Sequence, residues 1–349
     1  MPRARLAVVS PGRTSSGGSA FAQNLAGELD AILGEDVVLA GIPATGSATL
    51  PEPVATAETI VFLGARVVDH QARHAVFWPL NVAPLDHSIN YLPHTTVRNR
   101  ARHLLLRARY GQSVRRADAL VFGSHYARAL YTTAFAAAAP LPYAVIPGGT
   151  PSVRRVERPA NPRLPDGRRL VLCCSHLYPY KGILQLVSAL GRVRDRLPAD
   201  LLVRIAGADR DVRYAAAVRA KVAELGLGQI VEVGGATPEE LAELYGQAEL
   251  CVFPSTCENA GSFALFDGFH AGVPTICSDR SSMPEMARGA AILVNPHDER
   301  ALGEAILDVL GSPTEQERLA AAAREWSRTA PTWATRAAAL VHFVDGLSR

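Results

Sequence analysis

The sequence predicts an α/β protein of two domains, each built around a doubly wound parallel sheet. The chain has 349 residues, more than a single hydrophobic core usually organises. Short apolar runs alternate with helical patterns along most of its length, which favours right-handed strand–helix–strand units. The short runs are apolar throughout rather than at every second residue, as expected of parallel strands that are covered on both faces.

The first domain is expected over residues 1–150. Its first helix is predicted over 18–33, because apolar residues recur on one face at Phe21, Leu25 and Leu29. A connection rich in proline and arginine, 150–169, follows the domain. The predicted strands are Leu6–Ser10, Asp36–Ala40, Thr59–Leu63, Ala75–Trp78, Ala119–Phe122 and Tyr143–Pro147.

The second domain is expected over residues 151–330, followed by a last, alanine-rich helix within 331–349. Strand and helix patterns alternate through it in the same way. The predicted strands are Leu170–Ser175, Leu201–Ala206, Ile230–Val233, Leu250–Phe253 and Thr275–Ser278. The predicted helices are Ile183–Asp195, Tyr214–Leu225, Pro238–Gln247, Ser262–Ala271 and Glu299–Leu310.

Composition excludes several classes of protein. With 48% hydrophobic and 20% charged residues the chain can bury a large core, and no apolar run reaches the roughly 18 residues of a membrane-spanning helix. The apolar part of the N-terminus is too short for a signal peptide. Five cysteines lack metal-ligand spacing and lie largely in apolar runs, so we expect buried, reduced thiols, a cytoplasmic location and no bound metal.

One stretch of the first domain is strongly basic. No acidic residue occurs between Asp86 and Asp118, whereas seven arginines do. Either this stretch meets an anionic acceptor or a membrane surface, or it is the solvated face of a helix in an arginine-rich protein. The second interpretation is favoured, because no clean amphipathic stripe accompanies the arginines. They are Arg98, Arg100, Arg102, Arg107, Arg109, Arg115 and Arg116.

The most informative segment is 253–285. Glu258 and Asp267 lie nine positions apart. A small, glycine-bearing turn, Asn259–Ser262, follows Glu258 and opens a predicted helix that contains Asp267. Backbone N–H groups at the start of a helix bind phosphate, and the flanking carboxylates accept hydrogen bonds from hydroxyls. A phosphate and a polyol together are what a nucleotide sugar presents. The alternatives are a solvent-facing loop residue for Glu258 and a surface charge for Asp267, which its aromatic neighbours disfavour.

A second candidate is Lys181, in the loop that follows the first strand of the second domain. The chain has 34 arginines and two lysines, so a lysine at this place suggests that a compact ammonium group is required. Lying just before a predicted helix, it would meet a diphosphate. The alternative is an ordinary surface lysine.

Two further motifs follow strands of the first domain. Gly17 and Gly18 open the first helix and let the backbone approach an anion. The loop before them lacks a dinucleotide-binding glycine fingerprint, and an ordinary flexible loop is the alternative. Trp78 and Asn81 would line the acceptor side, or they are a core tryptophan and a turn asparagine.

With these motifs, the chain resembles the retaining, nucleotide-sugar-dependent glycosyltransferases of family 4, the group 1 transferases. These have the GT-B fold, two Rossmann-like domains that face each other across a cleft. The resemblance covers nearly the whole chain, and its most specific part is the carboxylate pair within 255–285. Shorter matches are Ala117–Leu120 with Ser124 and Tyr126, Val145–Gly149, and Ala291–Pro296.

The resemblance implies roles for these residues. Lys181 and Glu258 would be catalytic, the lysine paired with the donor diphosphate and the glutamate with hydroxyls of the donor sugar. Asp267 would hold the ribose, and the last helix would pack back on the first domain. The donor site would comprise Gly17, Gly18, His176, Lys181, Glu258, Asn259, Ala260, Gly261, Ser262, Phe263 and Asp267.

The sequence departs from the family pattern at two of these positions. Eight residues rather than seven separate the two carboxylates, and the second is an aspartate, one methylene shorter than the usual glutamate. His176 stands where the family has an arginine near the diphosphate, and a neutral histidine supplies less positive charge.

The expected reaction is transfer of a sugar, with retention, from a nucleoside diphosphate sugar to an acceptor hydroxyl, without an obligatory metal or other cofactor. Lys181 and helix-start N–H groups would stabilise the departing diphosphate. Two alternatives stay open: a catalytically weak nucleotide-sugar-binding or partner subunit, and a sugar-nucleotide epimerase of the same shape. The basic stretch is compatible with an anionic or lipid-linked acceptor and with peripheral contact at the inner membrane face. No nucleic-acid partner is expected.

Overall fold

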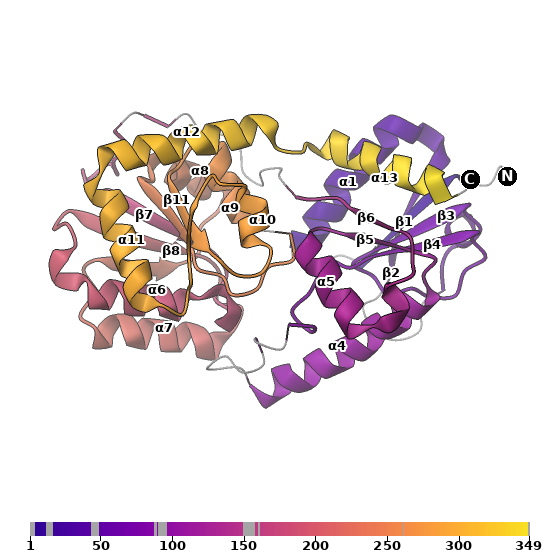
Figure 1. The fold of residues 1–349 in the computed structure, drawn as a ribbon, viewed down its shortest axis with the longest axis horizontal. Coiled ribbons are helices and arrows are strands. Elements are labelled where there is room, and N and C mark those ends of the chain that lie inside the picture. The colour runs from indigo at the N-terminus through magenta and orange to yellow at the C-terminus, as the bar shows by residue number, and fades with distance from the viewer. Residues whose placement is uncertain are drawn as a thin grey trace. The chain divides into compact units, whose positions relative to one another are not determined.

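The chain divides into two compact units, drawn in Figure 1. The first comprises Met1–His87, Val97–Gly148 and Pro331–Arg349, and the second Ser88–Thr96 and Gly149–Ala330. Each unit holds a six-stranded sheet in which neighbouring strands are parallel. The computed structural model describes residues 4–11, 17–42, 49–86, 89, 96–148, 158–159, 161–260 and 262–347.

The sheet of the first unit has the strand order β2-β1-β3-β4-β5-β6. Every residue of β3 and β5 is buried, as parallel strands between two layers of helices are. The strands are β1 (Leu6–Pro11), β2 (Val37–Ile42), β3 (Thr59–Leu63), β4 (His74–Trp78), β5 (Ala119–Phe122) and β6 (Tyr143–Val145). The helices are α1 (Gly17–Leu33), α2 (Glu52–Ala55), α4 (Val97–Arg116), α5 (His125–Ala134) and α13 (Trp333–Leu347), with 3-10 turns at Gly34–Asp36 and Ala136–Ala138.

The last helix, α13, packs against α1 inside the first unit. Arg336 of α13 is 2% exposed, and its guanidinium lies 4.3 Å from the ring centroids of both Phe21 and Trp333. Burial lowers the pKa of Arg336 to about 9. The two aromatic faces compensate part of the lost hydration of the cation, so this contact joins the C-terminal helix to the first.

The sheet of the second unit has the order β12-β11-β10-β7-β8-β9. Its strands are β7 (Arg169–Cys174), β8 (Leu201–Ala206), β9 (Val231–Gly234), β10 (Leu250–Phe253), β11 (Thr275–Ser278) and β12 (Ile292–Val294). The helices are α6 (Ile183–Arg192), α7 (Val212–Glu224), α8 (Pro238–Gln247), α9 (Phe263–His270), α10 (Met283–Ala287), α11 (Glu299–Gly311) and α12 (Pro313–Thr329), with 3-10 turns at Pro179–Lys181 and Arg194–Arg196.

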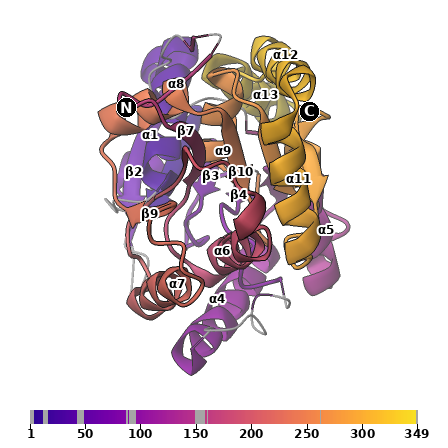
Figure 2. The same ribbon diagram turned by 90° about the vertical axis from the view of Figure 1, so that its left-hand side faces the viewer.

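Two hydrophobic clusters cover the two faces of this second sheet. One contains buried side chains of α6, α7 and α11, together with Leu319 of α12, and the other contains those of α8, α9 and α10 and other buried side chains of α12. Figure 1 and Figure 2 show where these helices lie around the sheet. Successive residues of β7 alternate between them: Val171 and Cys173 belong to the first cluster, Leu170 and Leu172 to the second. The continuous apolar runs of the sequence therefore result from burial on both faces.

Every strand predicted from the sequence is present, with bounds shifted by at most two residues. The prediction missed β12, α2, α5, α10 and α12. Helix α12 shows the reason, because its buried face consists of Leu319, Ala320, Ala323 and Trp326. Alanine contributes little to a hydrophobic pattern although it packs closely, so the periodicity is weak in the sequence.

The described ranges contain no helix that is both long and apolar enough to cross a membrane. All five cysteines are free, and four of them are buried, as expected. Burial raises the pKa of Cys174 to about 11 and that of Cys277 to about 12. These two thiols are therefore protonated at neutral pH.

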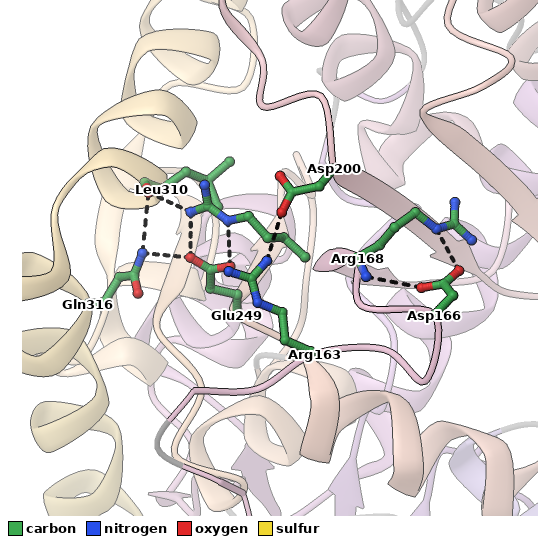
Figure 3. A network of polar contacts seen from close by, with 8 residues as sticks. Arg163, Asp166, Arg168, Asp200, Glu249, Leu310 and Gln316 are labelled. Carbon is green, nitrogen blue, oxygen red and sulfur yellow. Dashed lines mark hydrogen bonds and ion pairs between the residues drawn. The ribbon is translucent and has the colours of Figure 1, made fainter.

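A network of polar contacts closes the amino-terminal end of the second sheet (Figure 3). Arg169, the first residue of β7, donates from Nε and Nη2 to the two carboxylate oxygens of Glu249, at 2.8 and 2.6 Å. Nη2 also donates to the carbonyl of Leu310 at 2.5 Å, and Gln316 donates to Glu249 at 2.8 Å. Glu249 directly precedes β10, so the network joins two neighbouring strands to α11 and α12.

Glu249→Ala should lower the free energy of unfolding by about 3–5 kcal/mol, because it leaves the largely buried Arg169 guanidinium without its counter-charge. Urea unfolding measures the loss. Glu304→Ala is the matched control, since Glu304 pairs with Arg196 on the surface and its removal should change little. Similar losses for both variants would contradict the role assigned to the network.

Candidate functional site

Two neighbouring strands mark the centre of the second sheet. β7 pairs with β8 on one side and with β10 on the other, so the strand order reverses between β7 and β10. Open α/β sheets bind ligands beyond the carboxyl ends of the strands at such a switch point. The loop after β7, 175–182, contains Lys181, and the loop after β10, 254–262, contains Glu258.

The structure brings Lys181 and Glu258 into direct contact. Lys181 Nζ lies 2.5 Å from Glu258 Oε1, and the two side chains are 15% and 10% exposed. The centroid of the Tyr180 ring lies 5.3 Å from Nζ. Burial by itself lowers the pKa of Lys181, but the charge of Glu258 and the hydrogen bond between the two groups outweigh it, so the pKa is raised. The buried ammonium therefore stays charged at neutral pH.

Gly182 sets the separation of the two loops. Its φ of +70° lies in the left-handed region, and a Cβ built there would lie 2.0 Å from the carbonyl oxygen of Pro254. Thr256 adds two bonds, because its backbone N–H and its hydroxyl both donate to the carbonyl of Tyr180, at 2.8 and 3.1 Å. Glycine alone permits this close approach, which holds Lys181 beside Glu258.

A third loop, after β11, holds the backbone of Glu258. The Glu258 N–H donates to Ser281 Oγ, and Ser282 Oγ donates to the Glu258 carbonyl, both at 3.0 Å. Ser281 has a φ of +54°, a conformation that costs energy for a residue other than glycine. Our sequence reasoning missed both serines. The available signal was their position just after a predicted strand of the same sheet.

His176 lies in the same loop as Lys181. Its Nδ1 accepts a hydrogen bond from the Ala208 N–H at 3.2 Å, which places the ring proton on Nε2. Partial burial, then the charges of Arg210 and Lys181, lower the pKa of His176. The ring is therefore neutral at pH 7, and its predicted contact with a diphosphate would be through an uncharged N–H group.

Helix α9 begins at the predicted phosphate-binding turn. Ser262 caps the helix by accepting a hydrogen bond from the Leu265 N–H at 3.1 Å. Asn259 and Ala260 precede the cap, and Phe263 is the first helical residue. Gly261, which was also predicted to belong to the donor site, lies outside the described residues.

Asp267 is 4% exposed, on the buried side of α9. Its charge adds to the effect of burial in raising the pKa of Cys174 and of Tyr245, so the carboxylate lies close to both of these core side chains. The surface-charge alternative for Asp267 is wrong. Contact between Asp267 and a ribose stays a prediction. A carboxylate that is buried in this way offers little surface to a ligand.

The remaining predicted site residues lie in the first unit. Gly17 and Gly18 are the first residues of α1, and the loop before them, 12–16, is outside the described part of the chain. Trp78 is 1% exposed in the core, and Asn81 Oδ1 accepts the N–H group two residues later at 2.9 Å. These are the core tryptophan and the turn asparagine named above as alternatives, and an acceptor role for them stays a prediction.

Within the residues that the structure describes, no three His, Cys, Asp or Glu side chains gather as a metal site requires. The polar groups that meet at the carboxyl end of the second sheet are an ammonium, a carboxylate, an imidazole and two hydroxyls. Such a set can bind an anion and position hydroxyl groups. Metal-independent chemistry stays an expectation.

Residues 155–326 match the family of group 1 glycosyl transferases. The second unit belongs to this family. The matched segment contains the Lys181–Glu258 pair, the Gly182 turn and the two serines of the loop after β11.

The chain spans less than two thirds of the length of the curated mannosyltransferases that it matches. The chain is 26% identical over 245 residues to the GDP-mannose-dependent alpha-(1-6)-phosphatidylinositol monomannoside mannosyltransferase of Mycolicibacterium smegmatis, an alignment that covers 66% of this chain and 63% of the relative. The sucrose-phosphate synthase of Thermosynechococcus elongatus matches the fold with a TM-score of 0.75, 19% identity and 99% of each chain covered. A glycosyltransferase of Rickettsia africae matches with a TM-score of 0.68, 13% identity and 100% of each chain covered. These structures confirm the predicted GT-B fold.

Gly182→Ala should destabilise the protein by about 1–3 kcal/mol more than Gly167→Ala, because only the first substitution drives a Cβ into another backbone. Gly167 is the matched control: its φ is +86°, and no heavy atom lies within 4 Å of an added Cβ, so it carries the backbone strain alone. Chemical unfolding of the two variants gives the difference. Equal losses would show that the two loops do not meet at Gly182.

An NMR titration should give His176 a pKa below the ordinary value of 6.5 and show Nε2 protonated at pH 7. Because the folded pKa is lower than the unfolded one, the stability that the neutral ring contributes is present above the unfolded pKa and is lost as the pH falls. His176→Asn should remove this part of the pH dependence. A measured pKa above 6.5 would refute the assignment.

Proposed function

We propose that the protein transfers a sugar from a nucleoside diphosphate sugar to an acceptor hydroxyl. The observation that carries this proposal is the buried Lys181–Glu258 ion pair, which lies at the switch point of the sheet and within the group 1 glycosyl transferase segment. Burial of an ammonium and a carboxylate costs free energy, so such a pair is weak support for stability and stronger support for a binding site.

Lys181 would stabilise the departing diphosphate. Its ammonium is charged, and the Gly182 turn holds it in place before any ligand binds. Together with the N–H groups at the start of α9, it would meet the negative charge that develops on the phosphate oxygen as the bond to the sugar breaks. We propose a metal-independent reaction, because these groups supply the positive charge that a metal ion would otherwise bring.

Glu258 would position the donor sugar by accepting hydrogen bonds from its hydroxyls. Contacts from Ser281 and Ser282 fix the backbone from which its carboxylate projects. In the proposed step, the bond from the anomeric carbon to the phosphate oxygen breaks, the acceptor oxygen bonds to that carbon, and the acceptor proton passes to the leaving phosphate. Retention of configuration rests on the family resemblance.

The relative from Mycolicibacterium smegmatis suggests the first substrates to test. It is named as GDP-mannose-dependent and as a phosphatidylinositol monomannoside mannosyltransferase. We therefore propose GDP-mannose as the donor and a lipid-linked acceptor, used by a cytoplasmic protein that contacts the membrane peripherally.

Lys181→Ala and Glu258→Gln should each lower kcat/KM for the donor about 100-fold or more, as loss of a preorganised charge-stabilising group does. Release of GDP from GDP-mannose in the presence of a lipid-linked acceptor measures the rate. Lys221→Ala is the matched control, because the only other lysine pairs with Glu224 at 2.7 Å on the surface of α7. Unchanged turnover in folded Lys181→Ala protein would rule out its proposed role.

Product analysis with the unmodified protein separates the alternative functions. Donor binding with neither transfer nor hydrolysis would indicate a nucleotide-sugar-binding subunit. An isomerised donor formed without acceptor would indicate an epimerase. A glycosylated acceptor would support the proposal.

A further inference from the structure

A polar concavity of about 200 Å³ lies in the first unit, between α4 and the loop that follows β3. We propose that it binds a phosphate monoester. The inference is independent of the Lys181–Glu258 pair, which belongs to the second unit. The lining residues are Arg66, Val67, Val68 and Asp69 from the loop, and Arg109, Gln112, Ser113 and Arg116 from α4.

The concavity is built into the fold. The Val67 N–H donates to Ser113 Oγ at 3.1 Å, and Ser113 is 1% exposed, so this bond fixes the loop against the helix. Arg109 and Arg116 lie seven positions apart on α4 and therefore share one face, with Gln112 between them. Arg66 completes the lining from the loop.

The charge of the lining favours an anion. Three arginines and one acidic residue, Asp69, line the concavity. Asp69 lies 3.4 Å from Arg116, but its side chain is 99% exposed, so the pair is well solvated and contributes little. In the described part of the chain no carboxylate pairs with Arg109. A dianion would therefore gain at least one arginine that makes no ion pair with the described residues.

Phosphate matches these donors in geometry and size. Guanidinium groups present paired N–H donors that fit two oxygens of one phosphate, and Gln112 adds an uncharged amide. A volume of about 200 Å³ is several times that of a water molecule in the liquid, enough for a phosphate and part of its alcohol.

The rest of α4 (Figure 1) strengthens the field at the concavity. Arg98 and Arg102 lie on the same face as Arg109 and Arg116, because all four are spaced by four or seven residues. No acidic residue occurs between Asp86 and Asp118 to oppose them. A row of one charge sign raises the local concentration of anions.

Two sources can present this chemistry, a soluble phosphate ester or the headgroup of a phospholipid. Leu104 and Leu105 of α4 are 67% and 65% exposed, so a lipid surface would find apolar side chains beside the arginines. The shared ligand is the phosphate monoester, and the experiment distinguishes its sources.

Calorimetric titration of Lys181→Ala protein with glycerol 1-phosphate tests the site, because this background removes the ammonium proposed to bind phosphate in the second unit. Arg109→Gln should weaken binding about 10-fold or more, as loss of a charge-assisted contact does. Arg100→Gln is the matched control: it removes the same charge from α4, nine positions away and on the opposite face, and should leave the affinity nearly unchanged. Asp69→Asn should tighten binding.

Co-sedimentation with vesicles identifies the source. Binding to phosphatidic acid in phosphatidylcholine vesicles, lost in Arg109→Gln and kept in Arg100→Gln, would assign the site to a lipid headgroup. Titration with glycerol 1-phosphate that succeeds without such vesicle binding would assign it to a soluble ester. Equal losses in Arg100→Gln and Arg109→Gln would overturn the proposal, because the charge of α4 would then act as a diffuse field. Wild-type affinity in both Arg109→Gln and Arg116→Gln would also overturn it, because the arginines that line the concavity would then not bind the phosphate.

Discussion

Contact between Gly182 and the carbonyl of Pro254 is the constraint on which the candidate site depends. β7 and β10 are hydrogen-bonded neighbours, so the loops that follow them leave the sheet at the same edge. Adjacency alone does not decide how close the loops come. Gly182 decides it, because a residue without a Cβ lets one backbone approach the other to a distance that no other residue tolerates. Lys181 and Glu258 then meet as a consequence of backbone packing.

The same two strands carry an ion pair at each end, and the two pairs differ in how completely they are satisfied. At the amino ends, Arg169 and Glu249 form a bidentate pair to which Gln316 and a carbonyl add further bonds (Figure 3). At the carboxyl ends, the bond from Lys181 to Glu258 uses one of the three donors of an ammonium. The first pair is a closed structural network, whereas the second retains capacity for a ligand.

Sequence reasoning succeeded where a residue type was unusual for its surroundings. A lysine in a chain of arginines, and a carboxylate beside a small turn, identified the two side chains that the structure places in contact. Ser281 and Ser282 could not be found in this way, since serines after a strand are ordinary and their contacts to Glu258 depend on the pairing of β10 with β11. Trp78 was predicted at the end of a strand, as the structure has it, but its side chain is buried in the core.

The sequence by itself determined where the strands lie, with the exception of β12, because burial on both faces of a parallel strand leaves a local, continuous apolar run. It also predicted an ammonium and a carboxylate in loops that follow strands, the two groups that the structure places in contact. Only the tertiary structure decided that these two groups, 77 residues apart, form one buried pair. That outcome depends on which strands become neighbours and on how closely two backbones pack. Both are non-local properties that leave no periodic trace in the chain.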